Sequence, residues 1–353
     1  SMPTDDYTFN HFQMDVPVLV VYTNGGNLLA TDTVLTFDDS AAGGVSFNLR
    51  LNTFLYNTRT LERIRVTIDP TGATATVTVA RSWGGTAAAA LLDNDQWVVY
   101  SRASEDKAGS PTMISDDPTK IQNYTQTIRH PIDISRRAAQ THLRTGSNYE
   151  KLAREQLIRI LGDIEGAFIY GEKNDAAGAV TGQRLTTTSG LLEFITTNVK
   201  DFAGTMTDSS LLVELERIFR FSKVEEKLLL AGGTMLSTLE RLAKLQGNPL
   251  VLLEPDRTFG LKVRTWASTH GDIQILYHPK FGRASEMADW GVVVDPQYLA
   301  YRYFGDEDIA LILDKTDDPS EDGFTDEWLV DCGLQMGLEN TFGEWQNAAA
   351  AAI

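Results

Sequence analysis

The stretch SNYEKLAREQLIRILGDIEGAFIYG, residues 147–171, predicts the best-defined helix of the chain. Ser147 and Glu150 match a capping box, in which hydroxyl and carboxylate each accept a hydrogen bond from a backbone N–H of the first turn. Gly171 predicts a left-handed end. Apolar residues at three- and four-residue steps form one stripe; they are Tyr149, Leu152, Ala153, Leu157, Ile160, Leu161, Ile164 and Phe168. At about 1.5 Å per residue the helix is about 36 Å long, so we expect it to lie across another part of the fold.

The composition indicates a folded protein with an acidic surface. The chain has 353 residues, 42% hydrophobic and 22% charged, and a formal net charge of −17. That charge argues against a dedicated nucleic-acid binder, which needs basic groups to displace phosphate counterions. Cys332 is the single cysteine, which excludes a disulfide framework and a thiolate metal cluster. No run approaches the roughly 18 apolar residues of a membrane span, so we expect no membrane partner.

The first hundred residues are rich in strand patterns. The run DVPVLVVY at 15–22 predicts an edge strand, because Pro17 cannot donate to a ladder. Period-two alternation predicts further strands at 33–37, 62–68, 74–80 and 96–100, with glycine and proline turns between them. We therefore expect a small antiparallel β subdomain ahead of the long helix. After the long helix in the sequence, amphipathic helices at 209–221 and 234–246 with interleaved strands predict a compact α/β unit.

No pattern predicts catalysis or metal binding. The five histidines lack ligand spacing, and His278 before Pro279 is interpreted as an ordinary strand-end histidine. Cys332 lies in a predicted strand and is interpreted as a small buried apolar residue. Asp306, Glu307 and Asp308 could chelate a hard cation, but without EF-hand spacing a solvated acidic turn is favoured. We expect no catalytic residue, no cofactor and no metal site.

Two glycine pairs have a structural and a functional interpretation. The run LLLAGGTML at 228–236 is strand, glycines, then helix, and helix N-termini bind anions. It lacks the lysine and the spacing of phosphate loops, so a tight strand-to-helix turn is favoured. Gly162 and Gly166, one helical turn apart, predict close approach of another backbone.

A series of short motifs in fixed order resembles the major capsid proteins of tailed bacteriophages with the Hong Kong 97-type fold. The motifs are Asn123-Tyr124-Thr125-Gln126 with Arg129 and 132–135, Gly162–Glu165 in the long helix, 190–192 to 197–199, 229–233, 271–273 to 278–279, 294–296 to Tyr303, and 337–340. In addition, 77–81 and 84–86 resemble a β-rich insertion of some members. The resemblance covers about residues 9–344. Each motif is weak alone, whereas their order and spacing are specific.

The resemblance implies an α+β, Hong Kong 97-like fold: a long spine helix with a β-sheet P-domain, an α/β A-domain, and an extended E-loop carrying a β-rich insertion. It implies five parts along the chain. They are an N-terminal arm and first E-loop leg at 1–30, the β-rich subdomain at 31–118, the second leg, spine helix and P-domain at 119–190, the A-domain at 191–291, and P-domain return strands with a C-terminal tail at 292–353.

The function implied is that of a major capsid protein, which assembles as pentamers and hexamers into the icosahedral head enclosing the double-stranded DNA. The implied partners are other copies of the chain, with scaffolding, portal, protease and decoration proteins, and DNA held without sequence-specific contact. The implied location is the virion, after assembly in the host bacterial cytoplasm. Only about ten residues precede the first predicted E-loop strand, fewer than is common in the family. This suggests proteolytic maturation, removal of a scaffolding-like leader or a truncated chain, and our hypothesis is a maturation cut.

Two other functions stay open at this point. An encapsulin-like nanocompartment shell shares the fold, although the β-rich insertion and the Asn-Tyr-Thr-Gln run favour the phage type. A soluble α/β hydrolase would have to use the scattered carboxylates and histidines, and no arrangement of them indicates one.

Overall fold

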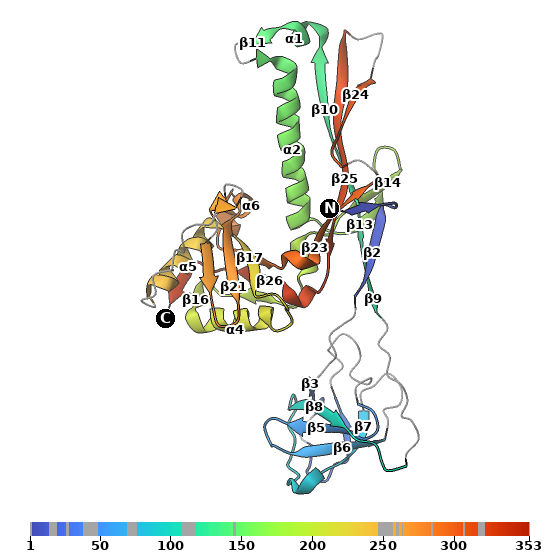
Figure 1. Cartoon of the computed structure of the whole chain (residues 1–353), viewed down its shortest axis with the longest axis vertical. Coiled ribbons are helices and arrows are strands. Elements are labelled where there is room, and N and C mark those ends of the chain that lie inside the picture. Colours follow the sequence, from blue (N-terminus) through green and yellow to red (C-terminus); the bar gives the residue numbers. More distant parts are fainter. Residues whose placement is uncertain are drawn as a thin grey trace. The chain divides into compact units, whose positions relative to one another are not determined.

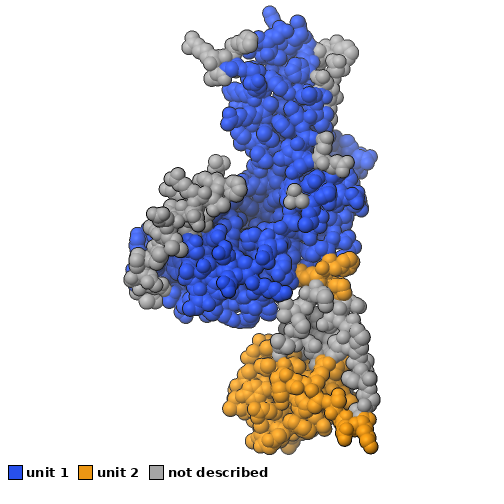
Figure 2. Space-filling view, in the orientation of Figure 1, with its two compact units in different colours: residues 1–11, 120–353 blue, residues 12–119 orange. Residues whose placement is uncertain are grey.

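The computed structural model describes residues 2–13, 20–25, 28–37, 49–68, 76–107, 118–143, 146–245, 257–258, 261–262, 264–283, 285–305, 308–316 and 322–352. The chain forms two compact units, one of residues 1–11 and 120–353 and the other of residues 12–119 (Figure 2). The first unit contains the long helix α2 (Asn148–Tyr170), which runs beside two long strands (Figure 1).

Those strands are β10 (Gln126–Ser135) and β25 (Gly323–Met336), which pair antiparallel along the whole length of β10. The sheet order is β1-β23-β25-β10, and β24 also pairs with β25. The other strands are β1 (Met2–Thr4), β23 (Leu299–Phe304) and β24 (Ala310–Thr316). Ahead of α2 lie α1 (Arg136–Gln140) and the paired β11 (His142–Leu143) and β12 (Gly146–Ser147). The predicted platform of helix and sheet is therefore present, and its second half comes from the far end of the sequence.

A narrow arc of α2 is buried. Ile160 and Ile164 pack with Ile128, Val330 and Cys332 of the two long strands. Trp328 of β25 donates its indole N–H to the Ala153 carbonyl at 3.0 Å, which ties the first half of the helix to the sheet. The placement of Leu161 in the buried stripe was wrong, since its side chain is 48% exposed. Successive helical residues are about 100° apart, so a contact with two strands cannot bury both Ile160 and Leu161.

Both ends of α2 differ from the prediction. The Ser147 hydroxyl accepts from Glu150 N at 3.5 Å, so within the described residues only this half of the capping box forms. The left-handed end was wrong, because Gly171 is extended, with φ −60° and ψ 143°. Glycine is needed there for space, since a Cβ atom would lie 2.5 Å from the Thr188 carbonyl oxygen.

Behind α2 the chain forms the hairpin β13 (Asn174–Ala177) and β14 (Arg184–Thr187) and then an α/β unit. Its sheet order is β15-β26-β22-β17-β21-β20. These strands are β15 (Val199–Asp201), β26 (Gly343–Gln346), β22 (Gly291–Val294), β17 (Glu226–Ala231), β21 (Asp272–Tyr277) and β20 (Arg264–Ala267). The predicted helices are confirmed as α4 (Asp208–Phe219) and α5 (Gly233–Leu245), whose apolar faces join one core with this sheet.

Short elements complete the α/β unit and its connections. They are α3 (Leu191–Phe194), β16 (Thr205–Thr207), β18 (Arg257–Thr258), β19 (Leu261–Lys262), α6 (Pro279–Arg283), η3 (Ser285–Met287), η4 (Pro296–Tyr298), η5 (Glu339–Thr341) and β27 (Ala350–Ala352). Residues 292–353 were assigned to P-domain return strands with a C-terminal tail, but β26 lies inside the α/β sheet and β27 pairs with β16. The stretch assigned to P-domain return strands therefore also contributes to the α/β unit.

The second unit is a small antiparallel barrel of order β3-β8-β5-β6-β7-β4 (Figure 1). Its strands are β3 (Val20–Tyr22), β8 (Gln96–Arg102), β5 (Thr53–Asn57), β6 (Arg63–Ile68), β7 (Thr76–Ala80) and β4 (Val34–Thr36), and η2 (Trp83–Gly85) follows β7. A bridge between Thr23 and Phe37 joins the two edge strands, so the sheet closes on itself. Trp97 is fully buried in its core and donates to the Thr23 hydroxyl at 2.9 Å.

The predicted β-rich subdomain thus exists, but β5 was missed and β3 lies in the stretch assigned to the first E-loop leg. Residues 15–19 of the predicted 15–22 strand lie outside the described residues. The strands β2 (Thr8–Gln13) and β9 (Thr119–Tyr124) pair with each other where the chain passes between the units. The five-part domain assignment itself stays a prediction.

We predict that Ile160→Asp and Leu161→Asp, adjacent changes of identical chemistry, will differ sharply. Ile160 is 0% exposed, so a carboxylate there has no partner in the apolar cluster and should cost about 3–5 kcal/mol of unfolding free energy. Leu161→Asp should stay within about 0.5 kcal/mol of the parent. Urea denaturation followed by circular dichroism measures both, and equal destabilisation would contradict this placement of α2.

Candidate functional site

The Asn-Tyr-Thr-Gln motif lies where β9 leaves the body of the first unit, and Asn123 is its centre. Its side-chain amide donates to the Leu334 carbonyl at 2.7 Å, the Thr188 hydroxyl at 3.1 Å and the Ser189 carbonyl at 3.3 Å. Its carbonyl oxygen accepts from Ser189 N and Tyr124 N, each at 2.8 Å. Since Asn123 is only 6% exposed, this one side chain satisfies buried backbone groups from segments 66 and 211 residues away in sequence.

The rest of the motif holds the N-terminal segment and the hairpin. Thr125 N donates to the Tyr7 carbonyl at 2.8 Å, and the Tyr7 and Tyr124 rings stack with centroids 6.5 Å apart. The Thr186 hydroxyl donates to the Thr125 carbonyl at 2.6 Å. The motif is therefore a structural joint between β9, β14 and β25, built from groups that water would otherwise solvate.

A second joint connects two motifs that are far apart in sequence. The carboxylate of Glu339 accepts from Thr196 N at 2.7 Å and from Thr197 N at 2.6 Å. The amide of Asn198 donates to the Asn340 carbonyl at 2.9 Å and to the Phe342 carbonyl at 2.8 Å. These contacts fix the C-terminal segment where it enters the α/β sheet as β26.

The α/β unit contains a fully buried ion pair. The Lys227 ammonium lies 3.2 Å from the Asp295 carboxylate and donates to the Thr341 carbonyl at 2.5 Å, and both charged side chains are 0% exposed. Ser222 donates to the same carboxylate at 3.1 Å. Burial lowers the pKa of Lys227, while the neighbouring Asp295 carboxylate opposes that shift. The pair joins β17 to η5 and to Asp295, which lies between β22 and η4.

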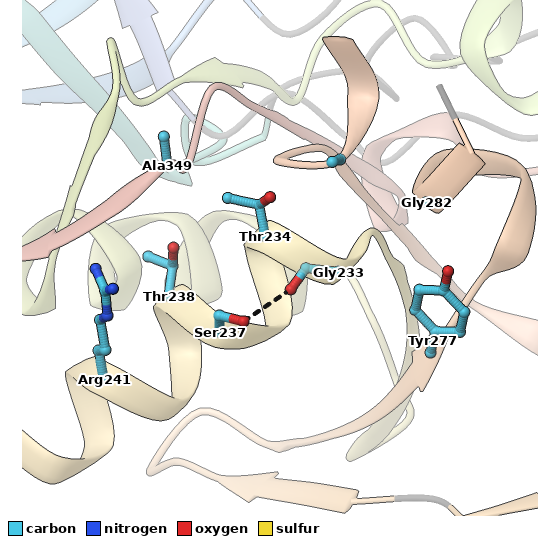
Figure 3. Close-up of a pocket in the computed structure, with 9 residues that line it drawn as sticks. Gly233, Thr234, Ser237, Thr238, Arg241, Tyr277, Gly282 and Ala349 are labelled. Carbon is cyan, nitrogen blue, oxygen red and sulfur yellow. Dashed lines mark hydrogen bonds between the residues drawn. The ribbon is translucent and has the colours of Figure 1, made fainter. Parts of the chain in front are cut away.

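The glycine loop before α5 is a turn and not an anion site. Thr234 N and Met235 N both donate to the Ala288 carbonyl, at 2.9 and 3.1 Å, so these amides have partners already. A Cβ atom on Gly232 would lie 2.4 Å from the same oxygen, which explains the glycine. A hollow of about 350 Å³ does lie beside the helix start, lined by hydroxyls and Arg241 (Figure 3). The interpretation as a tight strand-to-helix turn is confirmed.

His278 contacts the spine helix, which the sequence did not predict. Its Nδ1 accepts from Lys280 N at 3.3 Å, and its Nε2 lies 2.9 Å from the Glu165 carboxylate, to which it donates. The Lys280 ammonium donates to the Gly162 carbonyl at 2.6 Å. The expectation of a second backbone at Gly162 and Gly166 was therefore wrong: a lysine side chain crosses there, 3.5 Å from a Cβ atom built on Gly166.

The remaining candidates carry no chemistry in the described residues. Cys332 is 1% exposed, and burial raises the pKa of its thiol to about 12, so it is an inert core residue. Asp306 and Glu307 lie outside the described residues. Within the described part of the chain, no group of three or more histidine, cysteine or acidic side chains could hold a metal ion, and no helix is long and apolar enough to cross a membrane.

The two long-range joints and the His278 contact thus hold together three parts of the first unit. These parts are the platform of α2, β10 and β25, the α/β unit, and the end of β9. The chain belongs to the SU10 major capsid protein family, whose model matches residues 21–349. Members of this family are structural capsid proteins, so the hydrolase interpretation is wrong.

A major capsid protein of Pseudomonas phage PaMx41 is 23% identical over 285 residues, which is 78% of this chain and 65% of that protein. The match thus spans just under two thirds of that relative's length. Among solved structures, the holo-SrpI encapsulin of Synechococcus elongatus is 12% identical, with 66% of this chain and 77% of that chain covered and a TM-score of 0.49. The capsid of a native GTA particle is 12% identical, with 71% and 82% covered and a TM-score of 0.49.

We predict that Asn123→Ala destabilises the first unit by about 2–3 kcal/mol, because Ser189 N and the Leu334 carbonyl lose a buried partner. Gln122→Ala, the half-buried neighbour, is the control and should change the unfolding free energy by less than about 0.5 kcal/mol. Chemical denaturation measures both variants. Equal, small effects would show that Asn123 is not the centre of the joint.

We also predict that acid destabilises the folded chain through His278, because protonation charges a buried ring and removes the Nδ1 acceptor that Lys280 N uses. Burial, the largest cause, and Lys280 lower the pKa of His278, and Glu165 opposes them. A histidine whose folded pKa lies below its unfolded value near 6.5 contributes its full stability above that value and loses it as the pH falls. Wild type should therefore lose more thermal stability between pH 7.5 and 5.5 than His278→Gln, whereas His270→Gln, an exposed control, should match wild type.

Proposed function

We propose that this chain is the major capsid protein of a tailed double-stranded DNA bacteriophage, which self-assembles as pentamers and hexamers into the icosahedral head. The carrying observation is the match of the SU10 major capsid protein family over residues 21–349. The mechanism is assembly and not turnover: one chain repeats the same interfaces by symmetry. The structural joints at Asn123 and Glu339 support this function, because repeated interfaces require a rigid body.

Each part has a proposed place in the shell. The α/β unit acts as the A-domain around the five- and six-fold axes. The platform of α2, β10 and β25 acts as the P-domain, and β2 with β9 forms the E-loop legs that carry the barrel toward a neighbouring subunit. DNA is enclosed without sequence-specific contact, which fits the net charge of −17.

The proposal includes partners and location. Copies of this chain are the principal partner, and scaffolding, portal, protease and decoration proteins are further ones. Assembly takes place in the host bacterial cytoplasm, and the mature protein resides in the virion. An encapsulin-like shell is the second candidate function, since it would use the same body to package enzymes.

The purified chain should sediment as large particles and form closed shells in negative-stain electron micrographs. The variants Ile160→Asp and Leu161→Asp provide the control: the first should yield no shells, and the second should yield normal ones. Particles isolated from infected cells should contain DNA. A strictly monomeric chain at high concentration would contradict the proposal, and particles filled with an enzyme would favour the encapsulin-like alternative.

A further inference from the structure

The barrel of residues 12–119 carries an outer face that its own core does not use. In β5 and β6, Leu55, Ile64 and Val66 point into the barrel core. The paired residues Phe54 and Arg65, and Tyr56 and Arg63, therefore share the opposite face. Trp83 of η2 and Tyr100 of β8 lie beside them, 38% and 49% exposed. We call Phe54, Tyr56, Arg63, Arg65, Trp83 and Tyr100 the aromatic–arginine face.

The rings of this face position its two guanidinium groups. Arg65 stacks over Trp83 at 4.5 Å from the ring centroid, and Arg63 lies over Tyr56 at 5.4 Å. Phe54 supports the cluster, 5.4 Å from Trp83 and 6.1 Å from Tyr100 between centroids. A stacked guanidinium keeps its N–H edge free, and that planar edge matches a carboxylate in bidentate geometry.

These two arginines lack the carboxylate partners that others in the barrel have. Arg59 pairs with Asp95 at 2.6 Å, and Arg81 pairs with Glu62 at 2.7 Å. Within the described residues, neither Arg63 nor Arg65 is within ion-pair distance of a carboxylate. The Nε of Arg65 is itself buried without a hydrogen-bond acceptor, so a carboxylate from outside this barrel would bind the terminal N–H groups of the two guanidinium groups.

We infer that the aromatic–arginine face docks against an acidic surface of a second copy of this chain. The inference rests on the proposed function, because a shell holds copies side by side at high local concentration. Charge complementarity selects the occupant: the chain has 48 acidic against 31 basic residues, so the face is an exception on an acidic molecule. Arginine–aromatic pairs are also enriched at protein interfaces.

The first test uses the full chain with Arg63→Glu and Arg65→Glu combined. We expect folded protein, with an unchanged thermal melt, whose half-assembly concentration rises at least about tenfold, because like charges then face each other. Wild-type assembly should weaken with salt, whereas salt should partly restore assembly of the double variant because it screens the repulsion. Arg63→Lys with Arg65→Lys keeps the charge and should retain most of the assembly. The single variant Arg63→Glu is compared with Lys107→Glu, which reverses the charge of an exposed cation on the same unit outside the aromatic–arginine face. Arg63→Glu should weaken assembly and Lys107→Glu should not.

The second test does not depend on tolerance of charge reversal. Particles assembled from a mixture of ¹⁴N- and ¹⁵N-labelled Arg65→Lys chains are treated with a carbodiimide, which couples an amine to a carboxylate in direct contact. Mixed-isotope peptides joined at position 65 support the inference and identify the acidic partner. Assembly of the Glu variants at wild-type concentrations, or coupling within one chain alone, overturns it. Failure of wild type to assemble at all overturns the proposed function as well, so the two failures are distinguishable.

Discussion

The packing of α2 on the β10–β25 ladder is the constraint on which the rest of the first unit depends. Ile160 and Ile164 of the helix meet Val330 and Cys332, which lie about 170 residues further along the chain. Most of the α/β unit is therefore inserted between the two parts of one apolar contact, whereas its strands β26 and β27 follow β25. Because β25 continues from this ladder toward β26, the same strand connects the platform to the α/β sheet.

The polar joints make that arrangement specific. Apolar packing alone tolerates small displacements, whereas the hydrogen bonds of Asn123, Asn198 and Glu339 are satisfied in one register. Lys227 and Asp295 do the same inside the α/β unit. The motifs around Asn123, Asn198 and Glu339 thus mark places where distant segments meet. The aromatic–arginine face differs from them, since its two arginines have no carboxylate partner within the described residues of the barrel.

Local patterns predicted the elements that local physics decides. The periodicity of α2, α4 and α5 and the alternation of β6, β7 and β8 located them within a few residues. The missed features depend on tertiary contacts: the exposure of Leu161 follows from the narrowness of the ladder, and β27 forms from an alanine run because β16 offers an edge. No local signal distinguishes His278 as a partner of Glu165, or Asn123 as a partner of Leu334. Only the resemblance of the Asn-Tyr-Thr-Gln run indicated that Asn123 belonged to a functional element.

The central claim is that this body is one subunit of a closed shell. A cryo-electron microscopy reconstruction of particles formed by the chain tests it most directly. The account predicts an icosahedral shell in which the sheet containing β17 and β21 surrounds the five- and six-fold axes, and α2 lies along the P-domain of every copy. Particles without icosahedral symmetry, or a shell in which this sheet lies away from those axes, would contradict it.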